Sequence, residues 1–136
     1  MSISQEQLPL IEQLLNLPGV RVLSAEISER EMTIEIETTE DHAICHRCGR
    51  PATEFYCLGE ALRLRHFPVF NRQVYLLLRP KRYRCLHCED RPTSTRRDDW
   101  YDARGGVTRA YAQFLLREMI GSTLSDVARK HQASYD

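Results

Sequence analysis

Two stretches of the sequence each hold two cysteines separated by two residues: HAICHRCG at residues 42–49 and RYRCLHC at residues 82–88. Four thiolates in two such pairs are the ligand set of a closed, tetrahedral structural zinc site. A glycine after the first pair suits the left-handed backbone that a tight ligand loop often needs. The sequence therefore predicts one structural Zn²⁺ ion, with ligands at Cys45, Cys48, Cys85 and Cys88.

The pairs are 36 residues apart, whereas compact zinc fingers have about 15–20 residues between pairs. We therefore expect strands to be inserted between the two loops. A redox dithiol is the alternative, but neither pair is followed by the amphipathic helix that a thioredoxin-like site has. His46 and His87 could each replace a cysteine ligand, yet with four thiols present we expect them at the surface. Cys57 stands alone, as a small buried apolar residue would.

Between the cysteine pairs, alternating or apolar runs predict strands at residues 53–58, 61–67 and 73–83, with a turn at 68–71. Upstream, a short helix around Ile11, Leu14 and Leu15 should end at Pro18-Gly19. A half-buried hairpin should follow, with Leu23, Ala25 and Ile27 on one face and acidic residues on the outside of its second strand. The predicted fold is α+β: a small zinc-ribbon-like antiparallel β domain with an N-terminal helix and a C-terminal helical appendage.

We expect four regions along the chain. Residues 1–41 hold the helix and acidic hairpin, which pack on the zinc domain; residues 42–97 form that basic four-cysteine domain; and residues 98–106 are a linker. Residues 107–136 are typical of the start of a helix-turn-helix, with Gly121 as a helix cap and a second helix from Thr123. The chain ends where a recognition helix would run, and Gln132 occupies the usual glycine position. Two helices packed on the β domain are an equally supported alternative.

Charge is unevenly distributed although the formal net charge is +0. Residues 1–41 sum to −7, residues 42–97 to +8 and residues 98–136 to −1. A strongly basic middle indicates a surface for a polyanion, although the acidic block could instead neutralise it. The candidate nucleic-acid-binding residues are Arg63, Arg65, Arg79, Lys81, Arg82, Arg84, Arg96 and Arg97.

The longest apolar run covers only residues 74–78, and the first basic residue is Arg21. A membrane helix needs about 20 apolar residues and a signal peptide needs a basic start. We therefore expect no membrane partner and a reducing, cytoplasmic setting in which cysteines are not disulfide-bonded.

The chain as a whole resembles a known family in several ordered motifs. These are LPGV at residues 17–20, the first cysteine pair, RLRHFP at 63–68, RPKRYRC at 79–85, the second pair and DWYD at 99–102. Together they resemble the N-terminal zinc-finger domain of bacterial insertion-sequence transposases of the ISL-three family. The resemblance implies that a helix-turn-helix follows the zinc domain and that a separate catalytic core with an acidic triad completes the enzyme.

Residues 1–136 contain nothing that marks a two-metal carboxylate cluster, so we expect no catalytic residues and no enzyme activity. The expected function is transposon-end recognition on double-stranded DNA in the bacterial nucleoid. The alternative is a zinc-ribbon adaptor that binds another protein or a second copy of itself. A thiol redox protein is the third possibility.

Overall fold

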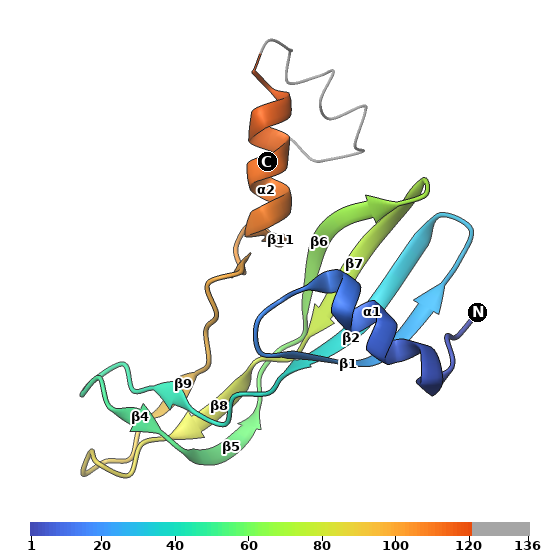
Figure 1. The fold of residues 1–136 in the computed structure, drawn as a ribbon. Coiled ribbons are helices and arrows are strands. Elements are labelled where there is room, and N and C mark those ends of the chain that lie inside the picture. Colours follow the sequence, from blue (N-terminus) through green and yellow to red (C-terminus); the bar gives the residue numbers. More distant parts are fainter. Residues whose placement is uncertain (121–136) are drawn as a thin grey trace.

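The computed structural model describes residues 1–120 and shows two lobes (Figure 1). The sheet lobe contains a six-stranded sheet and the helices, and the cysteine lobe contains short strands around the four cysteines. Gly121 and the predicted second helix lie outside the described residues. The α+β class is confirmed, since helices and a mainly antiparallel set of strands share one chain.

The sheet of the larger lobe has the order β1-β2-β7-β6-β11-β10. Its strands are β1 (Val20–Ile27), β2 (Glu31–Thr38), β6 (Leu62–Val69), β7 (Arg72–Leu78), β10 (Tyr101–Asp102) and β11 (Val107–Thr108). The predicted hairpin is confirmed as β1 and β2. The β2–β7 and β6–β11 pairs are parallel, and the other pairs are antiparallel.

The position of β6 and β7 differs from the prediction that residues 42–97 form one zinc domain. These strands pair with β2 and belong to the sheet lobe. The physical reason is that Leu64 on β6 and Leu76 on β7, both 0% exposed, need a large apolar partner surface. The buried face of β2, with Ile34 and Ile36, supplies that surface, and the small cysteine lobe does not.

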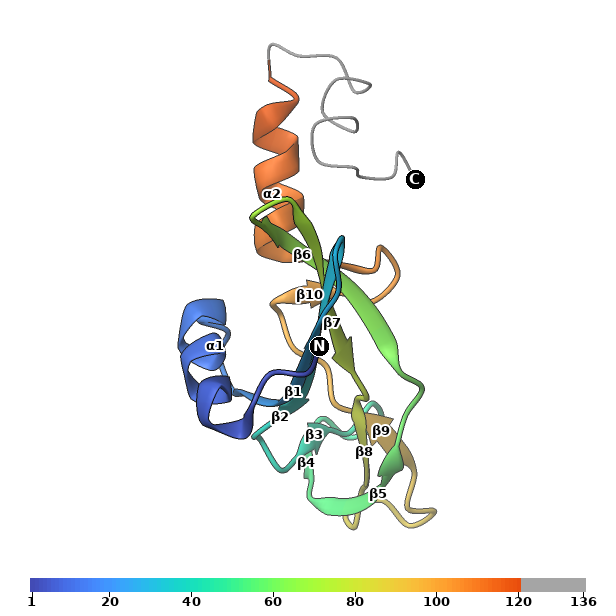
Figure 2. The ribbon, with the colours of Figure 1, turned by 90° about the vertical axis from the view of Figure 1, so that its right-hand side faces the viewer.

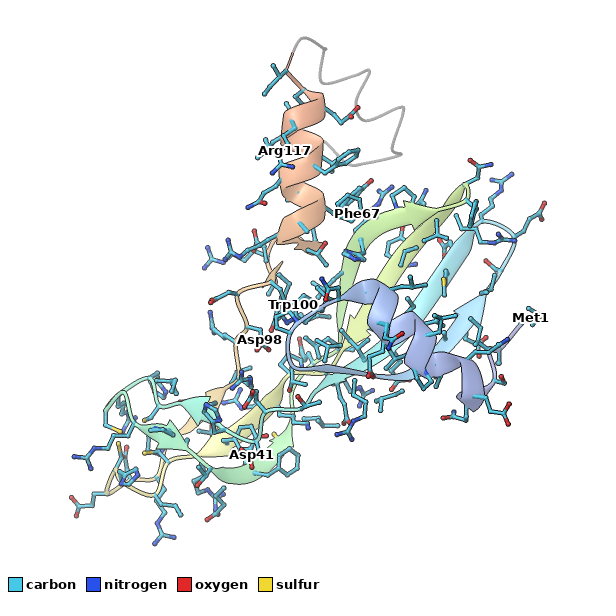
Figure 3. All side chains as sticks on the ribbon, viewed as in Figure 1. Met1, Asp41, Phe67, Asp98, Trp100 and Arg117 are labelled. Carbon is cyan, nitrogen blue, oxygen red and sulfur yellow. The ribbon has the colours of Figure 1, made fainter. Side chains whose placement is uncertain are left out.

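The core lies on one face of this sheet, where α1 (Leu8–Leu15) covers it after the short helix η1 (Gln5–Gln7) (Figure 2). Trp100 and Tyr101 join the same core and are 9% and 7% exposed (Figure 3). Residues 98–106, expected to be a linker, therefore contribute a strand and two aromatic side chains to the core. Burial of the two aromatic side chains is favourable in free energy, so they pack into the core instead of remaining in a solvated linker.

The side-chain pattern of β1 also departs from the prediction. Val22 and Ala25 are buried, while Leu23 is 36% exposed. The register with β2 shifts between Val22 and Ser24, so one extra residue interrupts the alternation. Leu23 therefore does not share the core face that was predicted for it.

The predicted C-terminal helix is α2 (Arg109–Glu118), which begins two residues later than expected because residues 107–108 form β11. Tyr111 is fully buried, and the ring centroids of Phe67 on β6 and Tyr111 are 5.2 Å apart. Phe67 lies beside α2 in Figure 3. Phe114 lies 5.3 Å from Phe67 and completes this cluster. Aromatic packing therefore holds α2 against the end of the sheet.

A two-residue turn joins β6 and β7, inside the segment predicted as a turn. Val69 pairs with Arg72, and the residues between them have positive φ angles of 45° at Phe70 and 68° at Asn71. Asparagine tolerates the left-handed region, but a bulky side chain such as that of Phe70 does so at a cost of about 1 kcal/mol. Phe70 is also 90% exposed, so no packing offsets that cost among residues 1–120.

The cysteine lobe is built from a two-stranded ladder and a three-stranded sheet. The ladder pairs β3 (Ala43–Ile44) with β4 (Pro51–Ala52), and the sheet has the order β5-β8-β9. Its strands are β5 (Glu54–Leu58), β8 (Lys81–Arg84) and β9 (Thr93–Thr95). The strand predicted at 73–83 is therefore two strands, which are interrupted at Pro80 because proline has no N–H to donate to a ladder.

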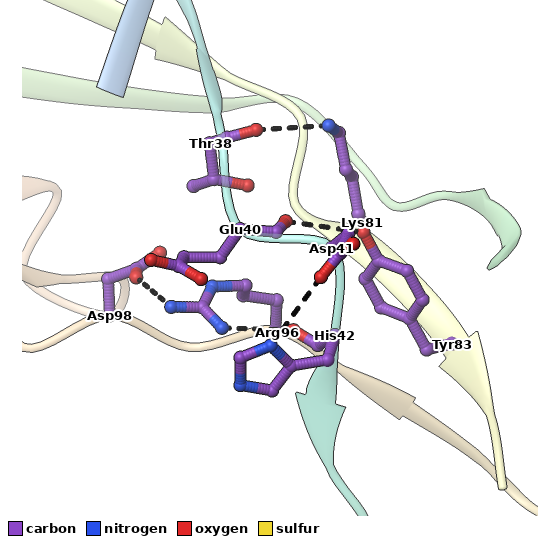
Figure 4. A network of polar contacts seen from close by, with 8 residues as sticks. All are labelled: Thr38, Glu40, Asp41, His42, Lys81, Tyr83, Arg96 and Asp98. Atoms are coloured by element: carbon purple, nitrogen blue, oxygen red, sulfur yellow. Dashed lines mark hydrogen bonds and ion pairs between the residues drawn. The ribbon is translucent and has the colours of Figure 1, made fainter. Parts of the chain in front are cut away.

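The chain passes between the lobes four times, at residues 38–43, 58–62, 78–81 and 95–101. Side chains tie these crossings together (Figure 4). The Lys81 ammonium donates to the Thr38 carbonyl at 3.0 Å, and the Tyr83 hydroxyl donates to the Glu40 carbonyl at 3.4 Å. The Arg96 guanidinium donates to the His42 carbonyl at 2.9 Å and to Asp98 at 3.0 Å. The junction between the lobes is thus cross-linked by polar contacts.

Candidate metal centre and basic face

The four predicted ligands converge at one point of the cysteine lobe. The first pair lies between β3 and β4, and the second lies between β8 and β9. The Sγ–Sγ distances are 3.9 Å for Cys45–Cys88, 3.6 Å for Cys48–Cys85 and 3.8 Å for Cys85–Cys88, and all four atoms lie within 4.8 Å of one another. A tetrahedron with Zn–S bonds of about 2.3 Å has edges of about 3.8 Å. The sulfurs therefore match a zinc tetrathiolate and are far too distant for disulfide bonds, which are about 2.05 Å long.

The backbone of each loop holds its pair of thiols in place. In the first loop, the N–H of Gly49 donates to the carbonyl of Cys45 at 3.0 Å. Gly49 has the positive φ predicted for it, 73°. In the second loop, the N–H of Arg91 donates to the carbonyl of Cys88 at 3.1 Å, and Arg91 itself takes the left-handed conformation. Side chains add to this, because the N–H of His46 donates to the Ser94 hydroxyl at 3.1 Å and Arg47 of the first loop pairs with Asp90 of the second.

Without a metal ion, the surroundings of the four cysteines do not favour the thiolate form of all four side chains. Hydrogen bonds from the backbone N–H groups of Cys48 and Arg47 lower the pKa of Cys45 to about 6. Burial, reinforced by the neighbouring thiols, raises the pKa of Cys88 to about 12. A doubly charged cation would offset the repulsion among four clustered thiolates, so the donor set and its electrostatics both fit Zn²⁺.

The other candidate ligands lie apart from this centre. His46 and His87 are exposed, as predicted. The ring of His46 points away to Ser94, with Nδ1 2.8 Å from the hydroxyl. Cys57, on β5, is only partly buried and is not in the cluster. No local sequence pattern predicts the His46–Ser94 contact, because it joins residues 48 positions apart.

The eight predicted nucleic-acid-binding residues do not form one surface. Arg63 and Arg65 lie on β6 in the sheet lobe. The Arg63 guanidinium pairs with Glu31 at 3.2 Å and lies 3.5 Å from the centre of the Tyr75 ring. Arg65 faces α2, where its charge acts on the hydroxyl of Tyr111. Both arginines therefore have structural partners far from the cysteines.

Three more of the eight have partners in or beside the cysteine lobe. Lys81 and Arg96 hold the junction, and Arg96 is 16% exposed at its side chain. Arg84 pairs with Glu54 at 3.3 Å and stays partly exposed. The remaining three are less constrained: Arg82 donates to the Thr93 hydroxyl at 2.8 Å, while Arg79 and Arg97 are exposed and form no ion pair among residues 1–120.

Side chains of β5, β8 and β9 share one outward surface, which we call the basic face: Tyr56, Arg82, Arg84, Thr93 and Thr95. Along β8, Tyr83 points inward to the small core, so Arg82 and Arg84 point outward, as the alternation predicted. On β9, Thr95 is the register partner of Arg82, and Thr93 is that of Arg84. The strand order β5-β8-β9 places these three strands side by side in the cysteine lobe.

A hollow of about 410 Å³ lies at the β9 edge of the basic face. Arg82, Arg97, Thr93, Thr95 and His46 line it. Guanidinium and hydroxyl donors around one hollow suit an oxyanion such as a phosphate.

No known protein family, curated protein or solved structure matches this chain. None of the helices within residues 1–120 has the length and apolar character that crossing a membrane requires.

Proposed function

We propose that this protein binds double-stranded DNA through the basic face and its hollow, with one structural Zn²⁺ holding that face in shape. The observation that carries the proposal is the row of outward guanidinium and hydroxyl groups of β8 and β9, directly beside the zinc loops. Arg97 extends the row. The zinc has no open coordination position when four thiolates hold it, so its role is structural and not catalytic.

The resemblance to ISL-three transposases supports a more specific proposal, that the DNA is a transposon end. In this proposal the chain recognises DNA and performs no chemistry on it. Arginine suits this task because its planar fork of donors contacts phosphate oxygens in pairs. Sequence preference should be modest, since phosphate contacts position a protein without reading bases.

Salt dependence tests the proposal. Two phosphate contacts, from Arg82 and Arg97, predict a slope of about −1.8 in a plot of log K against log salt concentration; Arg84 is not counted, because Glu54 pairs with it at 3.3 Å. In fluorescence anisotropy with a blunt duplex, Arg97→Ala should weaken binding and flatten the slope by about one. Arg97 is the best choice because it is exposed and forms no ion pair among residues 1–120.

Arg21→Ala is the matched control, since Arg21 is an exposed arginine on β1 in the other lobe, paired with Glu37 at 3.1 Å. It should leave affinity and slope unchanged. Equal behaviour of zinc-loaded Arg97→Ala, Arg82→Ala and Arg21→Ala would remove the basic face from the DNA surface.

A protein-binding adaptor is the second candidate. Its support is the acidic outer face of β2, where Glu35 is exposed, beside a groove of about 240 Å³ lined by Leu23, Leu58 and Leu77. A pulldown that survives nuclease treatment, and is lost in Leu77→Asp but not in Arg97→Ala, would favour this function over DNA binding.

A further inference from the structure

Strand β5 exposes three large apolar side chains in a row of five residues. Phe55 is 54% exposed, Tyr56 is 52% exposed and Leu58 is 48% exposed. β5 is also the edge strand of its sheet, with β8 as its only partner among the described strands. An exposed apolar edge strand is a liability that folded proteins usually avoid. These side chains therefore need an explanation outside the packing of this lobe.

A β-bulge redirects the central side chain of this strand. Phe55 pairs with Tyr83 and Cys57 pairs with Arg82, so Tyr56 is the extra residue. The Phe55 ring packs edge-on against the inward Tyr83 ring, with centroids 5.9 Å apart. The guanidinium of Arg84, in contrast, lies over the Tyr56 ring, 4.9 Å from its centroid. Tyr56 is thereby turned onto the basic face, and bulges commonly re-aim a side chain in this way beside a binding site.

We propose that Tyr56 is a stacking platform for an unpaired nucleotide base, so that the basic face prefers DNA with single-stranded nucleotides at its end over an uninterrupted duplex. This inference rests on the proposed function and names the form of DNA that the site takes. Proteins that bind single strands combine aromatic rings for base stacking with cations that follow the phosphates. Here Tyr56 supplies the ring, and Arg84 and Arg82 supply neighbouring cations.

A second copy of the chain fits this surface less well. The bulge disrupts the regular edge that strand addition between two copies would need. Pairing of two basic faces would also place Arg82 and Arg84 opposite their own copies, and like charges repel at such contacts. A polyanion carrying flat bases complements both features.

The test compares two DNA probes by anisotropy: a blunt duplex, and the same duplex with a three-nucleotide 3′ overhang. Wild-type protein should bind the overhang probe more tightly, and Tyr56→Ala should lose about 5- to 150-fold in affinity for that probe alone. Tyr56→Phe keeps the ring and should behave like the wild type. Phe70→Ala is the matched control, because Phe70 is an exposed aromatic on the other lobe.

A second readout detects stacking directly. With 2-aminopurine as the first unpaired base, wild-type protein and Tyr56→Phe should quench its fluorescence, whereas Tyr56→Ala should not. Zinc content, measured by native mass spectrometry, should be one ion in each variant.

Three results would overturn the inference: no preference of the wild type for the overhang, an equal loss in Tyr56→Ala and Phe70→Ala, or an equal loss on both probes. Salt-dependent duplex binding without an overhang preference would leave the proposed function standing and reject only the stacking role. Absence of binding to either probe would reject both. A dimer that Tyr56→Ala converts to a monomer would assign the surface to a second copy.

Discussion

The two lobes are stabilised by different means. The sheet lobe buries an extensive apolar set that includes Ile34, Ile36, Leu64 and Leu76. The cysteine lobe has a small core of Ala43, Cys45, Ala52, Tyr83 and Cys85, in which two of the five members are predicted metal ligands. Below a certain size an apolar core cannot offset the entropy of the ordered chain, and small domains then rely on metals. The difference predicts that zinc binding controls the stability of the cysteine lobe, whereas apolar packing controls the stability of the sheet lobe.

Removal of the metal should have the largest effect. Structural zinc contributes about 10–16 kcal/mol of apparent binding free energy in small peptides, so Cys45→Ser or Cys88→Ser should lose zinc and unfold the cysteine lobe. Hydrogen exchange should show lost protection in β5, β8 and β9 and retained protection in β2 and β7. Cys57→Ser is the control and should keep one zinc ion by native mass spectrometry. Loss of protection across both lobes would show that the sheet lobe also depends on the metal.

Shortening a side chain in the core of the sheet lobe should lower the stability of that lobe and leave the zinc content unchanged. Leu76→Ala should lower the free energy of unfolding by about 2–5 kcal/mol, because Leu76 is fully buried and the cavity cannot close completely. Urea denaturation at saturating zinc measures this loss, and the zinc content should not change. Leu14→Ala, at a 76% exposed position on α1, should change stability by less than about 0.5 kcal/mol. Equal losses in the two variants would contradict the placement of the core.

A substitution in the turn between β6 and β7 should raise the stability of the protein instead of lowering it. Phe70→Asn should raise the free energy of unfolding by about 1 kcal/mol, because asparagine accepts the left-handed conformation at lower cost. Thermal unfolding of the zinc-loaded protein measures the gain. A lower melting temperature in Phe70→Asn would mean that the aromatic ring stabilises the folded chain.

The smallest expected effect on folding stability comes from His66, and it is confined to acid pH. Burial lowers the pKa of His66 below its usual value of about 6.5, and Nδ1 lies 2.7 Å from the hydroxyl of Thr108. As pH falls below about 6.5, the unfolded chain takes up a proton that the folded chain resists, so stability falls with pH. His66→Gln should show a smaller loss between pH 7.5 and pH 5.5 in urea denaturation. The zinc thiolates are common to both proteins, so an identical loss would exclude His66 as its source.

The sequence predicted local features well, because cysteine spacing, alternation and breakers act over a few residues. It could not predict the partner of β6 and β7: alternating Leu62 and Leu64 show that one face is buried, but not against which strand. The parallel pairing of β2 with β7 joins segments about 40 residues apart and leaves no local signal. The sequence predicts a linker around Trp100, but burial of its ring in the core outweighs the preference of its acidic neighbours for water.

The candidate DNA surface was harder to predict for a related reason. A count of arginines gives the charge of a region but not the partner of each side chain. Arg63 is neutralised by Glu31, which lies 32 positions away, and Arg96 is neutralised by Asp98. Of the eight predicted residues, only those on or beside β8 and β9 adjoin the two cysteine loops.

The two crossings at residues 58–62 and 78–81 allow the cysteine lobe to be separated from the sheet lobe as a shorter protein. Leu58 and Lys81 are register partners on β5 and β8, so the 22 residues from 59 to 80 leave and re-enter the cysteine lobe at neighbouring points. Replacing them with a two-residue turn would leave 16 residues between the cysteine pairs, within the spacing of about 15–20 found in compact zinc ribbons. The central hairpin of the sheet lobe is thus inserted into the chain of the cysteine lobe. A shortened gene that encodes the cysteine lobe alone would carry the predicted metal ligands, Tyr56 and the cations of β8 without the sheet.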